Sequence, residues 1–414
     1  MRWTRNLTVA GAAATLVAAG LGPAAAGAST GSRHQSSAPV VVVSGLNNPR
    51  QLSLVQGKQL LIAEAGKGGT EVLINGPEGP SGLGATGSIS SVWRPSRAHN
   101  QSPHRIVTGL LSGASPDGSF ATGSDGVSSR KVYGPIYIQE TFFPTTALSA
   151  ALARQNGWLL KARAGSNHLK QVADITGFER TADPDRMGFD SDPYAVLALK
   201  NGELVADAAA NDVLWVDRHG NVSVFHVFHN VRTGACATQE DPPGFPGCNF
   251  VPTSLATDRH GHVFVGGLSS LTPGEAQVVE LSRNGKHVLR IWSGFSAVTG
   301  VAVAKDGTLY VSELFATEAN PIDPMVTGVL TKVDRHGNRT HIDVPFAAGL
   351  ALDQNGKDDR DGEHSRSGGD DRDKGHANTV YVSAWSVAPE NGLTPDGGTG
   401  PIPGTSGQVW QVHF

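Results

Sequence analysis

The sequence repeatedly places an acidic side chain at the end of a short apolar run. Such runs precede Glu64, Asp207 and Glu313, and each has the composition of a β-strand that ends at the acid. Carboxylates that converge from separate strands can hold a divalent cation, which activates water or polarises a carbonyl group. The alternative is that each carboxylate accepts hydrogen bonds from its own turn and has no part in chemistry. The sequence leaves both a metal-dependent hydrolase and a binding protein as functional hypotheses, and we expect binding.

The candidate pocket residues share one expected location, which is the ends of strands that face the longest connections. They are Arg50, Glu64, Asp125, Glu140, Asp192, Tyr194, Asp207, Glu313 and Trp385. Trp385 is the aromatic side chain best placed to form a platform for a ligand. No catalytic residue can be assigned, because the chain has no nucleophile motif such as Gly-x-Ser-x-Gly. We expect no cofactor and no metal, except that the hydrolase hypothesis requires a divalent cation.

A repeated turn predicts the scaffold. Asp-Arg-His-Gly occurs at 217–220, 258–261 and 334–337, each time before a strand-forming run. An Asp that opens a tight turn and a Gly that accepts positive φ are typical of β-hairpins. The apolar runs group into six units of four strands, of which the second is the least regular. The pattern predicts an all-β fold, a six-bladed β-propeller over residues 40–414 with four antiparallel strands in each blade.

The last unit supplies only three strands before the chain ends. The run Val40–Val43 precedes the first unit and otherwise has no partner. We expect this N-terminal strand to complete the last blade beside Val409–Val412, because closure of the ring removes an exposed edge.

The connections of unequal length predict two different faces. Long connections occur between the second and third strands of a unit and between successive units. Such loops on a rigid scaffold are where binding sites are usually built. The long connections are 66–87, 109–125, 140–157, 176–192, 226–252, 316–328 and 386–407. The segment 355–378 is different: it is charged, poor in apolar residues, and expected to be a disordered insert in the last blade.

The N-terminus has the pattern of a secretory signal. Arg2 and Arg5 precede a short run of Ala, Val, Leu and Gly, and cleavage is expected after Ala26 or Ala28. Residues 1–28 are therefore assigned as a signal peptide and 29–39 as a disordered linker. No later segment has the length and apolarity of a membrane span. We expect a secreted protein, or a periplasmic one if the host has an outer membrane.

Cys236 and Cys248 are the only cysteines. In an exported chain the pair favours a disulfide, and the rival interpretation is a thiolate metal site. The formal net charge is −4, with no basic stripe, which argues against nucleic acid as a partner. We expect a monomer whose partner is a small molecule or a cell-wall or other extracellular component.

Four segments resemble the ScyD/ScyE family of exported bacterial proteins. They are 45–50, 61–69, 192–196 and 205–212. The resemblance implies export and a six-bladed propeller related to NHL and lactonase-type repeats, and it implies no known reaction. Lactonases with this architecture bind one divalent metal near the axis through a Glu, an Asp and two Asn. In NHL-like repeats, by contrast, an Asp after the second strand bonds to its own turn, which implies a structural role for Asp207 and Asn211.

Overall fold

The computed structural model describes residues 38–76, 79–116, 121–166, 168–315, 328–354, 378–387 and 407–414. The expected signal peptide and nearly all of the expected linker and charged insert lie outside these residues. None of the helices in the described ranges has both the length and the apolarity needed to cross a membrane.

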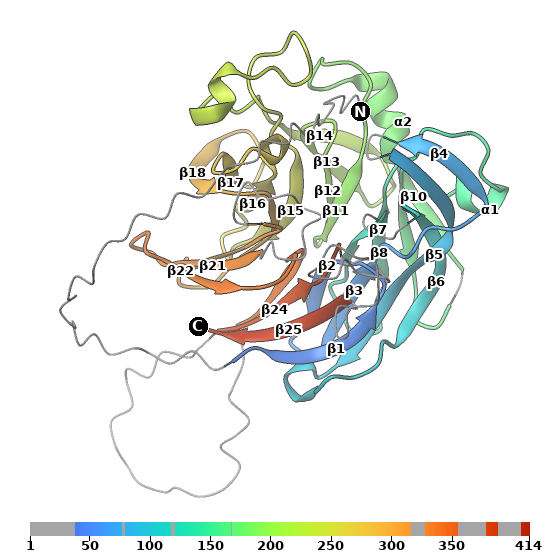
Figure 1. Cartoon of the computed structure of the whole chain (residues 1–414), viewed down its shortest axis with the longest axis horizontal. Coiled ribbons are helices and arrows are strands. Elements are labelled where there is room, and N and C mark those ends of the chain that lie inside the picture. Colours follow the sequence, from blue (N-terminus) through green and yellow to red (C-terminus); the bar gives the residue numbers. More distant parts are fainter. Residues whose placement is uncertain are drawn as a thin grey trace, which may run out of the picture.

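Nearly all regular structure is antiparallel sheet, shown in Figure 1. One sheet contains β1 (Val40–Leu46), β25 (Gly407–His413), β24 (Thr379–Ala384) and β23 (Leu350–Asp353). A second contains β11 (Pro193–Ala198), β12 (Gly202–Asp207), β13 (Asp212–Asp217) and β14 (Val222–Val227). A third contains β15 (Pro252–Thr257), β16 (Val263–Gly267), β17 (Ala276–Leu281) and β18 (Val288–Phe295). A fourth contains β19 (Val298–Val303), β20 (Leu309–Glu313), β21 (Val329–Val333) and β22 (Arg339–Asp343).

The largest sheet has nine strands. Eight follow one path in the order β10 (Lys170–Asp174), β9 (Trp158–Ala162), β8 (Ile136–Glu140), β7 (Ala121–Ser128), β6 (Arg105–Ala114), β5 (Gly79–Trp93), β3 (Gln59–Glu64) and β2 (Pro49–Val55). The ninth, β4 (Val72–Gly76), pairs with β5 alone. The helix α1 (Ala150–Ala153) lies between β8 and β9 of this sheet, and α2 (Ile175–Ala182) lies in the connection from β10 to β11 of the next sheet.

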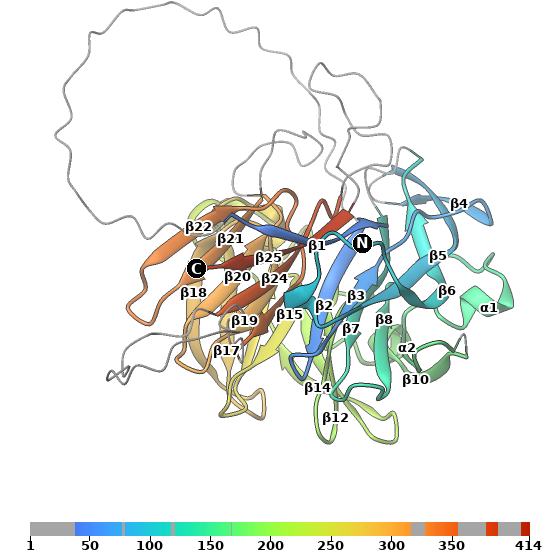
Figure 2. The same cartoon turned by 90° about the horizontal axis from the view of Figure 1, so that it is seen from below.

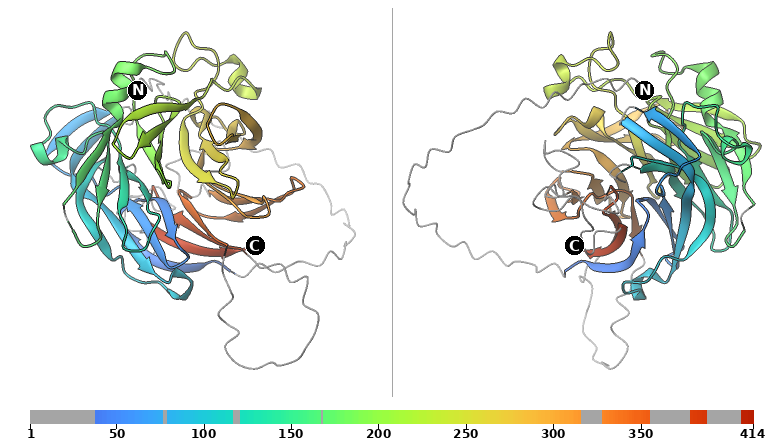
Figure 3. Two further views of the ribbon diagram at one scale, coloured as in Figure 1. Left: turned by 180° about the vertical axis from the view of Figure 1, so that it is seen from behind. Right: turned by 45° about the vertical axis from the view of Figure 1, so that its right-hand side comes forward.

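The innermost strands form a closed circuit. β2 contacts β7 and β23, β11 contacts β7 and β15, and β19 contacts β15 and β23. The sheets are therefore arranged around a common centre as the blades of a β-propeller, and Figure 3 shows the ring from behind and obliquely. Because neighbouring strands in a blade are antiparallel, the start of its first strand and the end of its second meet at one face.

The repeated Asp-Arg-His-Gly turns explain how these sheets recur. Asp217 Oδ1 accepts backbone N–H bonds from His219 (2.8 Å) and Asn221 (2.9 Å). Gly220 takes φ 85°, a conformation that glycine adopts without strain. The same pair of bonds forms at Asp258 and at Asp334. The side chain thus satisfies the turn backbone, and the predicted turn chemistry is confirmed.

The ring is closed by the N-terminal strand, as predicted. β1 pairs antiparallel with β25, with Val40 opposite Gln411, Val41 opposite Trp410 and Val43 opposite Val409. Figure 2 shows β1 beside β25 at this junction. Without β1, β25 would present an unpaired edge of backbone donors and acceptors.

The prediction that 66–87 and 109–125 are loops is wrong in part. The first contains the β4–β5 hairpin, and in the second β6 and β7 extend and pair with each other, with Ser112 opposite Gly123. The glycine-rich segment around Gly84 can form a strand because the backbone of the preceding segment around Gly69 packs closely against it. A Cβ added at Gly69 would meet Gly84 Cα at 2.7 Å, which only glycine avoids.

Closure by β1 predicts a large cost for a polar residue at Val43, which has no exposed surface in the junction. Val43→Ser should lower the free energy of unfolding by about 2–4 kcal/mol, since it leaves a cavity and a hydroxyl to satisfy. Val224→Ser, on β14 where 45% of the side chain is exposed, should cost less than about 0.5 kcal/mol. Urea denaturation of both variants measures the difference, and equal costs would contradict the closure.

Candidate functional site

The centre of the ring is crossed by the side chain of Gln51. Its Nε2 donates hydrogen bonds to the carbonyl oxygens of Thr253 (2.9 Å) and Thr299 (2.8 Å). These residues lie on β15 and β19, so one amide joins three sheets. The two threonine hydroxyls extend the network, to Val298 O (2.6 Å) and Ala347 O (2.8 Å). The residues at the axis are therefore engaged in holding the inner strands together.

Arg50, the neighbour of Gln51, is buried and links β2 to β7 on one side and to the residues that follow β24 on the other. Its guanidinium donates to the carbonyl oxygens of Ser386 and Ala121, and its Nε lies 3.3 Å from Asp125 Oδ1. Burial raises the pKa of Asp125, and the Arg50 charge partly offsets that rise. The structure thus brings Arg50 and Asp125 together, as an internal ion pair that links β2 to β7.

Three of the predicted acids accept a hydrogen bond from the same place in their blades. The donor in each case is the backbone N–H of a residue just before the first strand. The pairs are Glu64 with Asn47 (2.7 Å), Asp207 with Asp192 (2.6 Å) and Glu313 with Ser296 (2.7 Å). The acid at the end of the second strand therefore fixes the connection that enters the blade.

Further donors bind both carboxylate oxygens of Glu64. Ser88 and Ser90 donate to its Oε1 at 3.0 and 2.6 Å, and Arg105 Nη2 lies 2.7 Å from its Oε2. Glu313 Oε1 similarly accepts from Thr331 (2.8 Å), and burial raises the pKa of this carboxyl. These contacts are those of anchoring groups in a blade.

Asp207 is bonded on both oxygens. Ser191 Oγ donates to Oδ2 at 2.7 Å, and the Ala210 N–H of its own turn donates to Oδ1 at 3.4 Å. Burial raises the pKa of Asp207 to about 6 despite these bonds. Asn211, in the same turn, accepts the Val251 N–H at 3.1 Å and so links two blades.

Glu140 occupies the equivalent position on β8 and is less well satisfied. Its Oε1 accepts from Ser124 (2.7 Å), while its buried Oε2 has no partner among the described residues. Burial raises its pKa well above the ordinary value, and the charge of Asp125 adds to the rise. The matching positions on β16 and β24 are Gly267 and Ala384, so the acids do not form a complete ring.

Tyr194 and Asp192 belong to the electrostatic neighbourhood of the Arg50–Asp125 pair. Burial raises the pKa of Tyr194, with Arg50 opposing and both aspartates reinforcing the rise. Trp385 is elsewhere and half-buried. Its backbone N–H donates to Pro345 O (2.7 Å), and the centre of its ring lies 6.0 Å from that of Phe346. Its contacts are those of a core residue.

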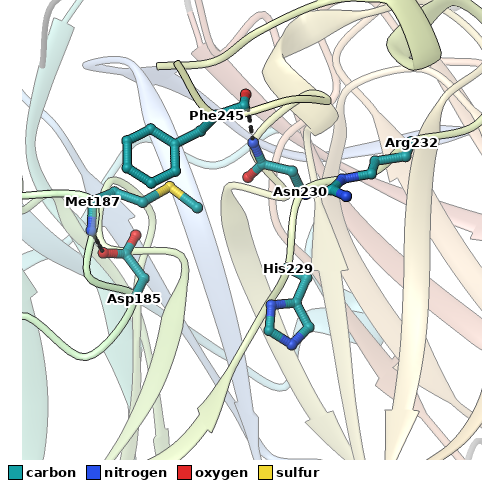
Figure 4. A pocket seen from close by; sticks show the side chains of 6 residues that line it. All are labelled: Asp185, Met187, His229, Asn230, Arg232 and Phe245. Atoms are coloured by element: carbon teal, nitrogen blue, oxygen red, sulfur yellow. Dashed lines mark hydrogen bonds between the residues drawn. The ribbon is translucent and has the colours of Figure 1, made fainter. Parts of the chain in front are cut away.

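A cleft of about 540 Å³ opens between two of the long connections, shown in Figure 4. One wall comes from the β10–β11 connection and the other from the β14–β15 connection. The lining residues are Asp185, Met187, His229, Asn230, Arg232 and Phe245. The length of both connections pointed to this face, but no pattern in the sequence indicated that these side chains meet.

The β14–β15 connection, which forms the second wall of the cleft, contains the disulfide. Cys236 and Cys248 are bonded, with their Cα atoms 5.2 Å apart, which confirms the predicted pairing. Asn230 Nδ2 donates to Asp241 O (2.8 Å) and to Phe245 O (3.3 Å) inside the same loop. The cleft is thus bounded by a braced loop.

Two groups of side chains in the described residues offer three metal-ligand atoms within 4.8 Å of one another. One is Glu179, Asp183 and Asp185, next to the cleft through Asp185; the other is Asp258, His262 and Glu280. Neither group includes Glu64, Asp207 or Glu313, the acids that the sequence suggested for an axial metal.

The contrast between Glu140 and Glu64 predicts opposite responses to loss of charge. Because the pKa of folded Glu140 lies above its ordinary 4.5, the wild type loses stability as pH rises from 4.5 toward the folded pKa. Glu140→Gln removes that loss. The free energy of unfolding of the variant minus that of the wild type should therefore increase between about pH 4 and pH 7.

Glu64→Gln should instead lower the free energy of unfolding at pH 7 by about 2–3 kcal/mol, since Arg105 loses its charged partner and three donors lose a carboxylate. Denaturant titrations at several pH values check both variants. A Glu140→Gln protein less stable than wild type at pH 7 would contradict the assignment.

Comparison with known proteins identifies no family. No protein-family model matches the chain, and no curated protein matches it. Among solved structures the chain is similar to a streptogramin B lyase, at 7% identity over 91% of this chain and 97% of that one, with a TM-score of 0.43. It is similar to the PQQ-bound aldose sugar dehydrogenase from Streptomyces coelicolor, at 12% identity over 92% and 98%, with a TM-score of 0.44. It is also similar to a virginiamycin B lyase from Staphylococcus aureus, at 10% identity over 91% and 98%, with a TM-score of 0.39.

Proposed function

We propose that this protein is an exported six-bladed β-propeller of the ScyD/ScyE type that binds a small molecule in the off-axis cleft. The six inner strands are counted as six blades, with the nine-stranded sheet as two blades joined along β6 and β7. The N-terminal signal pattern and the disulfide support export. Because the ring closes within one chain, we propose a monomer.

The observation that carries the proposal is that polar side chains at the axis bond to the strands and blades around them, whereas polar side chains of the long loops line a cleft. At the axis, Gln51 and Arg50 form bonds between blades, and the strand-end acids Glu64, Asp207 and Glu313 form bonds to the chain that enters their own blades. This commitment gives the metal-dependent lactonase, our alternative, less support than binding. In the cleft, by contrast, apolar surface and polar groups are presented together, which is the usual composition of a small-molecule site.

The lining defines the ligand class. Phe245 is 37% exposed and, with Met187, offers an apolar surface, while His229 and Arg232 offer donors. Such a lining suits a small molecule with an aromatic or other flat apolar part and a hydrogen-bond acceptor at its edge.

Saturation-transfer NMR with a series of aryl carboxylates, aryl amides and aryl amines tests this directly. At least one acceptor-bearing aryl compound should bind, and Phe245→Ala should weaken it by at least about fivefold through lost apolar contact. Leu73→Ala, which truncates an 80% exposed side chain in the β4–β5 hairpin, is the control and should leave binding unchanged. The proposal fails if no member binds at millimolar concentration, or if the Phe245 variant binds as well as the wild type.

Export is tested by the N-terminus of the protein recovered from its host. Mass spectrometry should find a chain that begins at Gly27 or Ser29, outside the cytoplasm. Recovery of an intact Met1 from the cytoplasmic fraction would contradict this part of the proposal.

A further inference from the structure

Three acidic side chains meet at the end of α2, beside the cleft. Glu179 lies on the last turns of α2, Asp183 caps the helix in the left-handed conformation (φ 40°), and Asp185 follows in the loop. One carboxylate oxygen from each lies within 4.8 Å of the other two. That separation is what two Ca–O bonds of about 2.3–2.6 Å span across a shared ion.

The group contains a buried carboxylate with nothing to bind it. Glu179 has no exposed surface, and neither of its oxygens has a hydrogen-bond partner among the described residues. A carboxylate in that position costs several kcal/mol unless it is protonated, paired with a cation or bound to a metal.

A second buried carboxylate, on another element, lies within electrostatic reach of this group. Asp212, at the start of β13, is fully buried, and both of its oxygens lack a partner among the described residues. Burial raises the pKa of Asp212 well above its ordinary value, and the negative charges of Asp207, Glu179 and Asp185 add to the rise. Burial with Asp207, Asp185 and neighbouring aspartates likewise raises the pKa of Glu179 to about 8.

Hydrogen bonds from the loop backbone and from Asn211 hold two of these carboxylates in place. Asp183 Oδ1 accepts the Gly188 N–H (3.2 Å), and Asp185 Oδ1 accepts the Met187 N–H (2.9 Å). Asn211 Nδ2 donates to Asp185 Oδ2 (3.3 Å), which ties the loop to the β12–β13 turn. These bonds hold the carboxylates in place and supply no positive charge.

We propose that Glu179, Asp183 and Asp185, with Asp212 beside them, form a calcium-binding site that fastens α2 and its following loop to the β12–β13 turn. The donors are all carboxylate oxygens, a set that suits calcium and that zinc, which prefers nitrogen and sulfur, does not favour. The site lies between two blades and off the axis, and it does not depend on the identity of the cleft ligand. Asp185 belongs to both, so the bound ion would stiffen one wall of the cleft.

The other three-residue group provides a matched control. His262 Nδ1 lies 2.9 Å from Glu280 Oε1 and 3.4 Å from Asp258 Oδ2, so these side chains already satisfy one another. Asp258 Oδ1 also accepts two backbone N–H groups of its turn. Asp258, His262 and Glu280 therefore partner one another, whereas Glu179 and Asp212 have no hydrogen-bond partner among the described residues.

The experiment uses the whole exported chain after treatment with EDTA and dialysis. Calorimetric titration with CaCl₂ to about 10 mM should show one site with Kd at or below about 1 mM, the weak limit for extracellular calcium modules. At about ten times Kd, calcium should raise Tm by about 2 °C. The absence of both heat and a Tm shift would overturn the proposal, as would a response to Zn²⁺ with none to Ca²⁺.

Variants assign the site. Glu179→Gln and Asp212→Asn should each weaken calcium binding at least about tenfold, yet without calcium their Tm should equal or exceed that of the wild type, because repulsion is removed. Asp183→Asn, at a half-buried position that does not endanger folding, should weaken binding as well. Glu280→Gln should bind within about twofold of the wild type. If the Glu179 and Asp183 variants both bind calcium like the wild type, the proposal is wrong.

Discussion

The ring depends on buried polar side chains that cross from one sheet to another at its centre. The inner strands β2, β11, β15, β19 and β23 each pair with a single neighbouring strand, so backbone groups on their other edge must find other partners. Gln51 serves two of these carbonyls on the far side of the ring, and Arg50 serves two more while pairing with Asp125. An amide and a guanidinium reach several acceptors at once, which explains why long polar side chains occupy so crowded a position.

The same need for backbone partners gives the acids at the mouth of the ring a structural role. Residue type and position made them look like metal ligands, but a carboxylate at the end of a second strand also lies opposite the N–H of the chain entering the same blade. Glu64, Asp207 and Glu313 all accept that N–H, whereas Glu140 lacks it and keeps a buried oxygen without a partner among the described residues. Anchoring thus accounts for Glu64, Asp207 and Glu313. Glu140 is the exception at the mouth of the ring, and two further buried carboxylates, Glu179 on α2 and Asp212 on β13, have no partner among the described residues.

Local patterns predicted the fold well because its repeats are local. The Asp-x-x-Gly turns satisfy themselves within five residues, and the β1–β25 pairing follows from counting strands. The β4–β5 hairpin was missed because glycine-rich segments form strands only where another backbone covers them. The cleft and the acids around Glu179 were missed for a related reason. They are made by α2 and two connections that meet in space. No spacing along the chain indicates that Glu179 lies beside Asp183 and Asp185 and within electrostatic reach of Asp212.

Anomalous diffraction from crystals of the exported chain soaked in Mn²⁺, a stronger scatterer with calcium-like oxygen ligands, tests the account most directly. We expect one peak enclosed by Glu179, Asp183 and Asp185, with Asp212 adjacent, and Gln51 still spanning the centre of the ring. A peak at the axis coordinated by Glu64, Asp207 or Glu313, or no peak near α2, would contradict it.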